Sequence, residues 1–206
     1  MFGASRIRLR GFERKRSENV RSKYAWPIMY HGHSEPSRLS AEAQEAIREV
    51  ATKTVKAIGI VTGPSHTEIM LREDGPKVIE MAACLGGDFI TSKLVPLSTG
   101  VDFVEGAVAA ALGLPYDFCP KRRGGSAIRF ITADRAGTIA SINVPDELHG
   151  VDGVEEVELY LKPGNSIETR HSSNDRIGHV VCSSADADEA TARAEWALRE
   201  IEVEIA

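Results

Sequence analysis

The sequence predicts an α+β fold in which a β-hairpin lies beside helices, and a second, smaller group of strands carries one further helix. The first observation is a pair of strand-like runs within residues 67–82, separated by a short turn. The second is a pair of helix patterns that begin at Ser40 and Asp102, two residue types suited to helix caps. The third is a set of β-rich runs after residue 125, followed by a helical pattern at 186–200.

These patterns divide the chain into three parts. Residues 1–22 form a basic N-terminal arm or a residual strand, residues 23–114 form a first structured domain, and residues 124–206 form a small α+β subdomain. The first 23 residues hold eight Lys or Arg and two Glu, a net charge of +6 that leaves −11 on the remainder. With Phe12 as the one aromatic residue in its basic run, this arm favours a solvated segment over nucleic-acid binding. Alternation around Ile7 fits a strand of a further lobe equally well.

The hairpin is predicted from two apolar runs, Thr67–Leu71 and Pro76–Ala82. The residues Glu73-Asp74-Gly75 between them fit a three-residue turn with glycine in the left-handed position. If Arg72 pairs with Pro76, the register that follows fixes every partner along the two strands.

In this register Glu68 stands directly opposite Glu80, with the two side chains on one face and about 5 Å apart. Like charges at opposed positions destabilise a sheet, so the pair calls for a base, a shared proton or a bound cation. Carboxylate oxygens suit Mg²⁺, which keeps several waters and shares its other positions with phosphates. The alternative is a solvated strand face on which each glutamate pairs with a Lys or Arg.

The segment around this hairpin resembles the metal-binding core of ATP-grasp ligases. The motifs that carry the resemblance are GPSHTE, a turn, a strand that ends in Glu80, LGG and DFITSKLVPLSTGVDF. The similarity runs from about Tyr24 to the C-terminus, is tightest between Ile60 and Gly113, and is greatest to carboxylate–amine and amino-acid ligases with a carbamoyl-phosphate-synthase-like core. It implies the C-terminal portion of a partial ATP-grasp fold, with an associated subdomain.

The resemblance implies a reaction in which ATP phosphorylates a carboxylate and an amine attacks the acyl phosphate. Glu68 and Glu80 match the two metal-binding glutamates, which hold Mg²⁺ or Mn²⁺ between the nucleotide phosphates. Gly86 and Gly87 match positions where the backbone approaches the nucleotide. The segment Ser98-Thr99-Gly100 matches a region near the acceptor substrate, although its hydroxyls and glycine are equally typical of loop structure and helix capping.

Two positions depart from the family pattern. After the second glutamate, relatives carry Asn and Arg where this chain has Ala82 and Cys84. Ala82 offers no amide oxygen to a second metal, and Cys84 offers no guanidinium to the transferred phosphate. Losing one such donor lowers rates on the order of 10²- to 10³-fold, and losing a phosphate-stabilising arginine about 10³- to 10⁵-fold. We therefore expect impaired catalysis.

The resemblance also implies a first nucleotide-clamping lobe, and no GxxxxGK[ST] or GxGxxG motif replaces it. The expectation is a truncated ligase whose other lobe comes from a separate chain, or a remnant of a longer ancestor. The alternatives are a non-catalytic pseudoenzyme or regulatory subunit that docks on a partner, and a structural fragment that forms a homo-oligomer. The carboxylate and the amine that would be joined cannot be named from these residues.

Two helices are predicted in the first structured part. The helix after Ser40 ends at Gly59, and the helix after Asp102, with Glu105 three residues on, ends at Gly113. The apolar positions expected to face inward are Ile47, Val50, Thr54 and Ala57 in the first helix and Val104, Val108 and Ala111 in the second. The residues between Gly87 and Asp102 are expected to form a loop.

The second structured part follows a linker at 115–125. Its predicted strands are Ala127–Thr132, Thr138–Ile142, Val157–Leu161 and Ile177–Cys182, and its helix is Asp186–Glu200, with Ala190, Ala194, Ala197 and Leu198 inward. A short strand near Trp26–His31 is expected before the first helix, with His31 and His33 as structural or polar residues rather than metal ligands.

The composition fits an ordinary globular protein: 42% hydrophobic, 27% charged, and a net charge of −5. The longest apolar stretch, 107–114, is too short to cross a bilayer, so we expect no membrane segment and a cytoplasmic location. Cys84, Cys119 and Cys182 form no CxxC pair and are odd in number, so we expect reduced, buried thiols. For Cys84, packing is favoured over a reactive thiol in the site.

Overall fold

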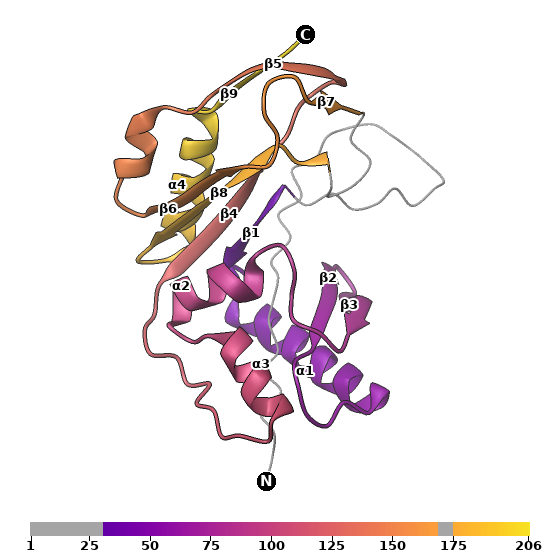
Figure 1. The fold of residues 1–206 in the computed structure, drawn as a ribbon. Coiled ribbons are helices and arrows are strands. Elements are labelled where there is room, and N and C mark those ends of the chain that lie inside the picture. Colours follow the sequence, from indigo (N-terminus) through magenta and orange to yellow (C-terminus); the bar gives the residue numbers. More distant parts are fainter. Residues whose placement is uncertain (1–30, 169–174) are drawn as a thin grey trace.

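The computed structural model describes residues 31–168 and 175–206 (Figure 1). The predicted arm at 1–22 and nearly all of the predicted strand at 26–31 lie outside these residues. The elements in chain order are β1 (Gly32–Glu35), α1 (Ala41–Ile58), β2 (His66–Arg72), β3 (Gly75–Ala82), η1 (Ile90–Leu94), α2 (Val95–Thr99), α3 (Phe103–Ala111), β4 (Gly125–Ile131), β5 (Gly137–Asn143), η2 (Asp146–Gly150), β6 (Val154–Leu159), β7 (Ser166–Ile167), β8 (Gly178–Ser184), α4 (Ala187–Arg199) and β9 (Glu202–Ile205).

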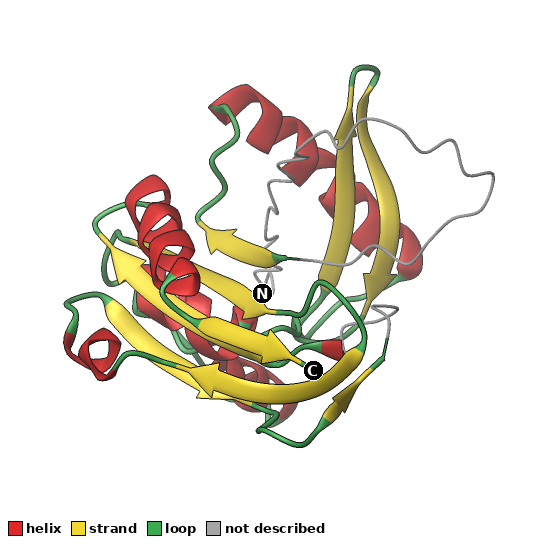
Figure 2. Ribbon diagram, turned by 90° about the horizontal axis from the view of Figure 1, so that it is seen from above, coloured by secondary structure: helices red, strands yellow, loops and turns green. Residues whose placement is uncertain are grey.

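The central sheet is antiparallel and has the strand order β1-β4-β8-β6. Its two inner strands alternate residues between two buried faces, as the pleat requires. Ala127, Val180 and Cys182 pack with the alanines of α4, whereas Ile128, Phe130 and Val181 pack with Ile90 and Leu94 of η1. Both faces are therefore covered, by α4 on one side and by the η1–α2 segment on the other (Figures 1 and 2).

The β2–β3 hairpin and α1 form a separate small core. Ile69 of β2 packs with Ile47 and Ala51 of α1, and Leu39 and Val50 cover the edge of this cluster. In Figure 1 this unit lies beside α3, in the half of the molecule opposite α4. Because Glu68 precedes the buried Ile69 in the strand, its side chain leaves the sheet on the face away from α1.

The hairpin prediction is confirmed, but its turn was placed wrongly. Arg72 pairs with Gly75, not Pro76, so Glu73 and Asp74 alone form the loop. A β-bulge then leaves Ile79 as an extra residue between the pairs Ile69–Val78 and Glu68–Glu80. The bulge compensates for the shorter loop and restores Glu68 and Glu80 as directly opposed residues.

The two predicted helix starts are confirmed. The Ser40 side chain accepts a hydrogen bond from the Ala43 amide, and Asp102 accepts from the amides of Val104 and Glu105. Gly59 ends α1 in the left-handed conformation. The inward stripe of α1 is Ile47, Ala51 and Val55, so Thr54 and Ala57 were wrong choices.

The predicted inward face of α3 is also wrong. The buried residues of α3 are Gly106 and Ala109, whereas Val104 and Val108 are 40% and 56% exposed and Ala111 is exposed as well. The cause is the composition of the helix: apart from Glu105, every position holds an apolar residue or glycine, so the periodic signal is weak. Phe118 settles the orientation, because a Cβ at Gly106 would lie 2.4 Å from its ring.

The segment between Gly87 and Asp102 is helical rather than a loop. It forms η1, a turn of π-helix, followed directly by α2. Within the described residues no single helix is long and apolar enough to cross a membrane. The bent pair Ile90–Thr99 and Phe103–Ala111, which meets at 114°, reaches those limits when its halves are counted together.

The C-terminal strands and α4 agree with prediction to within a few residues, with Asp186 as the N-cap of α4. Strands β4 and β5 fall in different sheets, because β5 pairs with β7 and β9, two strands absent from the prediction. Strand β1, from the predicted 23–114 domain, pairs with β4 of the 124–206 subdomain. The division of the chain into those domains stays a prediction.

Candidate functional site

The carboxylate pair, Glu68 and Glu80, lies on one face of the hairpin. The residues are directly opposite in the β2–β3 ladder. The Glu68 side chain is 18% exposed and lies 3.5 Å from His66, measured from Oε1 to Nε2, whereas Glu80 is exposed. Together they offer a metal ion two carboxylates, and magnesium prefers such hard oxygen ligands. Both residues therefore suit a divalent cation, and their binding of one stays a prediction.

The two glycines after β3 have different surroundings. A Cβ at Gly86 would lie 3.1 Å from His66 Nδ1 and 3.2 Å from Thr91 Oγ1, whereas nothing lies within 4 Å of one at Gly87. Gly86 therefore lets the 85–89 turn pack against the base of the hairpin. Gly87 has open space beside it, which a ligand could enter, so a nucleotide contact there stays a prediction.

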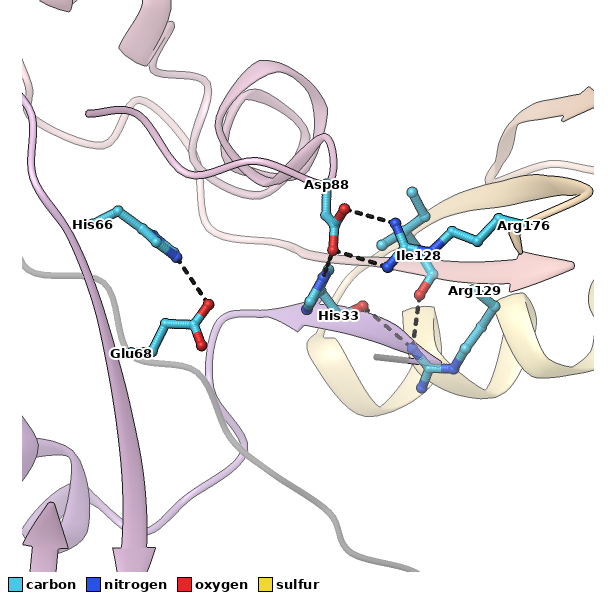
Figure 3. Close-up of polar contacts among 7 residues, drawn as sticks. All are labelled: His33, His66, Glu68, Asp88, Ile128, Arg129 and Arg176. Carbon is cyan, nitrogen blue, oxygen red and sulfur yellow. Dashed lines mark hydrogen bonds and ion pairs between the residues drawn. The ribbon is translucent and has the colours of Figure 1, made fainter. Parts of the chain in front are cut away.

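A second polar group, the aspartate–arginine cluster of His33, Asp88 and Arg176, lies next to this turn (Figure 3). Arg176 donates to both Asp88 oxygens, at 2.7 and 3.1 Å, and His33 Nε2 lies 2.9 Å from Asp88 Oδ2. The Arg176 guanidinium lies over the Phe130 ring, 3.4 Å from its centroid. The bidentate geometry and the ring contact hold the arginine in one orientation.

Asp88 is held at this place by an uncommon backbone. Asp88 and Phe89 have φ angles of 52° and 57°, and they are the non-glycine residues with positive φ in the described part of the chain. Such conformations cost energy and occur often at functional sites. Burial by itself raises the pKa of the Asp88 carboxyl, but hydrogen bonds from His33 and Arg176 and the charge of Arg176 outweigh it and hold the pKa well below its usual value.

The two groups face the same region of the molecule. In Figure 3, Glu68 and His66 lie on one side, and Asp88, His33 and Arg176 lie on the other. They are linked by the turn itself, because Gly86 packs on His66 and stands two residues before Asp88. Arg129 supports this arrangement by donating to the His33 carbonyl, which holds β1 in place. The hairpin group and the aspartate–arginine cluster therefore meet at the 85–89 turn.

A cavity of about 800 Å³ opens beside the same turn. It lies among α1, the 61–66 loop, η1, α2 and α3, and His66, Gly86 and Thr91 form part of its wall. The side of the cavity formed by α1 is strongly charged, with Arg48, Lys53 and Lys56 alternating with Glu45 and Glu49. Its volume is that of an ordinary small-molecule site.

The structure gives Ser98, Thr99 and Gly100 internal roles. The Ser98 hydroxyl is buried and donates to the Leu94 carbonyl at 2.9 Å, and the Thr99 hydroxyl donates to Val95 at 2.7 Å. Gly100 ends α2 in the left-handed conformation, with φ of 71°. These contacts give Ser98 and Thr99 a role within the helical segment and Gly100 a role at its end. Thr99 also lines the cavity. A substrate contact of the three residues stays a prediction.

Sequence reasoning missed the aspartate–arginine cluster. His33 had been interpreted as structural, and Asp88 and Arg176 had no assigned role. The signals were an acidic residue directly after two glycines and an isolated arginine before a buried strand. Neither residue type indicates which other residue it contacts, because 88 residues separate Asp88 from Arg176 in the sequence.

The predicted burial of the cysteines is wrong for two of the three. Cys84 and Cys119 are exposed, because they stand in irregular segments after β3 and α3, and Cys182 alone is buried. Burial raises the pKa of the Cys182 thiol to about 12. The packing role preferred for Cys84 is therefore incorrect.

Thiol labelling should separate these residues. With an excess of iodoacetamide at pH 8, we expect two thiols of the native protein to react rapidly and the third to react after unfolding, because the thiolate is the nucleophile. Cys84→Ser and Cys119→Ser should each remove one fast equivalent, and Cys182→Ser should remove the slow one. Fast labelling of all three thiols would contradict the burial of Cys182.

Comparison with known proteins agrees with this architecture. Residues 129–206 match the family described as L-amino acid ligase C-terminal domain 2. The L-amino acid ligase from Bacillus licheniformis superposes with a TM-score of 0.75 at 24% identity over 87% of this chain. This chain has the fold of the C-terminal portion of an ATP-grasp ligase. The predicted fold class and the resemblance are thus confirmed.

Two further proteins show the same partial overlap. Phosphoribosylglycinamide synthetase from Anaerococcus prevotii superposes with a TM-score of 0.71 at 19% identity over 92% of this chain. A curated relative, uncharacterized protein y4rH from Sinorhizobium fredii, is 33% identical over 156 residues, or 73% of this chain. The chain spans 45% and 48% of the two solved structures and 32% of y4rH.

A more distant ATP-grasp relative was solved with a nucleotide. The biotin carboxylase domain of Hydrogenobacter thermophilus 2-oxoglutarate carboxylase, in complex with MgADP and bicarbonate, has a TM-score of 0.59 at 24% identity. The match covers 84% of this chain and 39% of that one.

Proposed function

We propose that this chain supplies the metal-binding half of a magnesium–nucleotide site in an ATP-dependent carboxylate–amine ligase. The observation that carries the proposal is the opposed pair Glu68 and Glu80, two carboxylates on one face of a hairpin beside the 85–89 turn. The MgADP in the biotin carboxylase relative supports the choice of ligand. Mn²⁺ would serve as well, since it prefers the same oxygen ligands.

Glu68 and Glu80 would hold the cation, which when bound neutralises charge on the nucleotide phosphates. His66 orients Glu68 from the same strand, and Gly87 leaves open space for the nucleotide. Arg176 is a positioning residue: its ion pair with Asp88 and its contact with the Phe130 ring hold Asp88, two residues after Gly86, in place. A fixed backbone at this turn supports phosphoryl transfer, which depends mainly on positioning and on neutralisation of charge.

The proposed substrates are a small carboxylate and an amine, joined through an acyl phosphate. The charged cavity beside α1, with Arg48, Lys53 and Lys56, has the size and charge to take part in binding such a molecule. We propose impaired catalysis for this chain, because Ala82 and Cys84 stand where relatives carry an asparagine and an arginine. The remaining half of the site would come from a nucleotide-clamping lobe.

The second candidate function is a non-catalytic subunit that docks on such a lobe. A specific observation favours it: apolar side chains are exposed on the bulged strand β3 and at and just after the C-terminal end of α1. These residues are Val78, Ile79, Ile58 and Val61, with exposed fractions between 39% and 81%. Exposed apolar groups of this kind are typical of a surface that a partner covers.

Removing either carboxylate should weaken nucleotide binding. We expect Glu68→Gln and Glu80→Gln each to lower the Mg²⁺-dependent affinity for ADP at least about tenfold, because each variant loses an anionic metal ligand. Isothermal titration calorimetry with and without Mg²⁺ measures this. The matched control is Glu73→Gln, on the exposed loop of the same hairpin, which should leave the affinity unchanged.

Two results would contradict the proposal. One is an unchanged affinity in both site variants. The other is an absence of binding heat for the wild-type chain at millimolar Mg²⁺ and nucleotide, which would support a purely structural role. Binding to the wild-type chain without detectable turnover would favour the docking subunit.

A further inference from the structure

A second group of potential ligands lies at the edge of the central sheet. Glu156 and Glu158 stand two residues apart on β6, and His179 stands on β8 directly opposite Glu158. Residues two apart on a strand share a face, so all three side chains leave the same side of the sheet. One ligand atom from each lies within 4.8 Å of the others. We call these residues the edge cluster.

His179 is the unusual member. Its side chain is fully buried, and Nε2 is, among residues 31–168 and 175–206, the buried side-chain polar atom without a hydrogen bond. Native proteins rarely leave such an atom unsatisfied. Glu156 Oε1 lies 3.5 Å away, too far for a hydrogen bond but on the side toward which Nε2 points. A metal ion bound between Nε2 and Glu156 Oε1 would give the nitrogen a partner.

The other ring nitrogen has a hydrogen-bond partner that can fix its tautomer. Tyr160 Oη lies 2.5 Å from His179 Nδ1. If Nδ1 carries the proton and donates to this oxygen, Nε2 keeps its lone pair for a metal. Phe89 stacks on the imidazole, with ring centroids 4.6 Å apart, and fixes the ring plane. The orientation needed for coordination is thus built into the fold.

The charges around the cluster are compatible with a cation. Lys93 pairs with Oε2 of Glu156, so one oxygen of that carboxylate is engaged and Oε1 faces the histidine. Glu158 is half exposed and its Oε2 lies 3.9 Å from His179 Nδ1, so its side chain would have to turn toward Nε2 to bind the ion. Two carboxylates and one lysine leave a net negative charge on the cluster. An ion can enter from the side of Glu156 and Glu158, whose side chains are partly exposed.

We propose that Glu156, Glu158 and His179 form a transition-metal site, separate from the carboxylate pair at Glu68 and Glu80. One imidazole nitrogen with two carboxylate oxygens is a ligand set for Zn²⁺ or a similar divalent ion rather than Mg²⁺, which prefers oxygen alone. The site would link edge strand β6 to β8. Its imidazole also stacks on Phe89, the residue that follows Asp88. It does not depend on nucleotide binding at the hairpin.

The test is a metal titration of the full chain after removal of metal by a chelator. With Co²⁺ as a spectroscopic probe, we expect one equivalent to give ligand-field absorption without a thiolate charge-transfer band, and Zn²⁺ to displace it. Glu158→Gln and His179→Gln should weaken Co²⁺ binding at least about tenfold. The controls Glu155→Gln, on the same strand, and His149→Gln, in η2, should bind like wild type.

Circular dichroism checks the fold of each variant. Since His179 is buried, His179→Gln could unfold the chain, in which case the half-exposed Glu158→Gln decides the outcome. The proposal is overturned if the wild-type chain binds neither Co²⁺ nor Zn²⁺ at micromolar concentration. It is equally overturned if folded Glu158→Gln binds like wild type, or if a thiolate band shows that Cys84 or Cys119 is the ligand.

Discussion

Replacing Ala82 with Asn and Cys84 with Arg should raise ATP turnover at least about 10²-fold when the chain is combined with a nucleotide-clamping lobe. Ala82 stands two residues after Glu80 in β3, so an asparagine there would project from the same face and add an oxygen ligand to the metal. Cys84 is exposed just beyond the strand, so an arginine is accommodated without loss of packing. Both changes restore stabilisation of charge in the transferred phosphate.

The measurement uses a chimera in which this chain replaces the matched segment of the Bacillus licheniformis L-amino acid ligase. ADP release is followed for the parent chimera and the double variant. The matched control places the same residue types nearby, as Ala83→Asn with Cys119→Arg, and should leave turnover at the parent level. Equal turnover in the site and control variants would contradict the proposal that Ala82 and Cys84 impair catalysis. In the chain alone, Ala82→Asn should tighten Mn²⁺·ADP binding.

Asp88→Ala should lower the free energy of unfolding by about 3 kcal/mol or more, because it leaves the buried Arg176 guanidinium without its carboxylate. For a chain of this size that loss corresponds to a fall in Tm of roughly 6–12 °C. Chemical denaturation and thermal melts measure both quantities. Replacing the two partners together, as Asp88→Asn with Arg176→Met, should recover much of the loss, since no unpaired charge then remains buried and asparagine tolerates the positive φ at position 88.

The matched control for this prediction is the exposed pair Arg38–Asp188, in which the aspartate side chain is 73% exposed. Asp188→Ala should change stability by less than about 1 kcal/mol, because water screens such pairs. A loss of similar size in Asp88→Ala and Asp188→Ala would contradict the assigned role of burial at Asp88.

The same carboxylate predicts a pH dependence. Since the pKa of Asp88 is lower in the folded state than its ordinary value of 3.8, its stabilising effect is present above about pH 4 and is lost as pH falls toward the folded-state pKa. The stability difference between wild type and Asp88→Asn should therefore narrow as the pH falls below about 4. A difference that grows in acid would contradict the direction of the pKa shift.

The local elements of this protein were predictable because their signals lie within a few residues. Ser40, Asp102 and Asp186 accept hydrogen bonds from amides two or three residues away, so each helix start is encoded where it occurs. The opposed pair Glu68 and Glu80 was predictable from strand alternation, although the turn and the bulge were not. Those two errors cancelled because a shorter loop and an extra residue shift the register in opposite directions.

What the sequence determined by itself was therefore the hairpin, the three longer helices and the longer C-terminal strands, together with the ATP-grasp resemblance and the carboxylate pair. Only the tertiary structure decided which face of α3 is buried, since a helix that is apolar at nearly every position takes its orientation from its neighbours. The tertiary structure alone also brought together His33, Asp88 and Arg176, and likewise Glu156, Glu158 and His179, from different elements. Contacts between residues this far apart depend on how the sheet and its covering helices pack, and no local pattern carries that information.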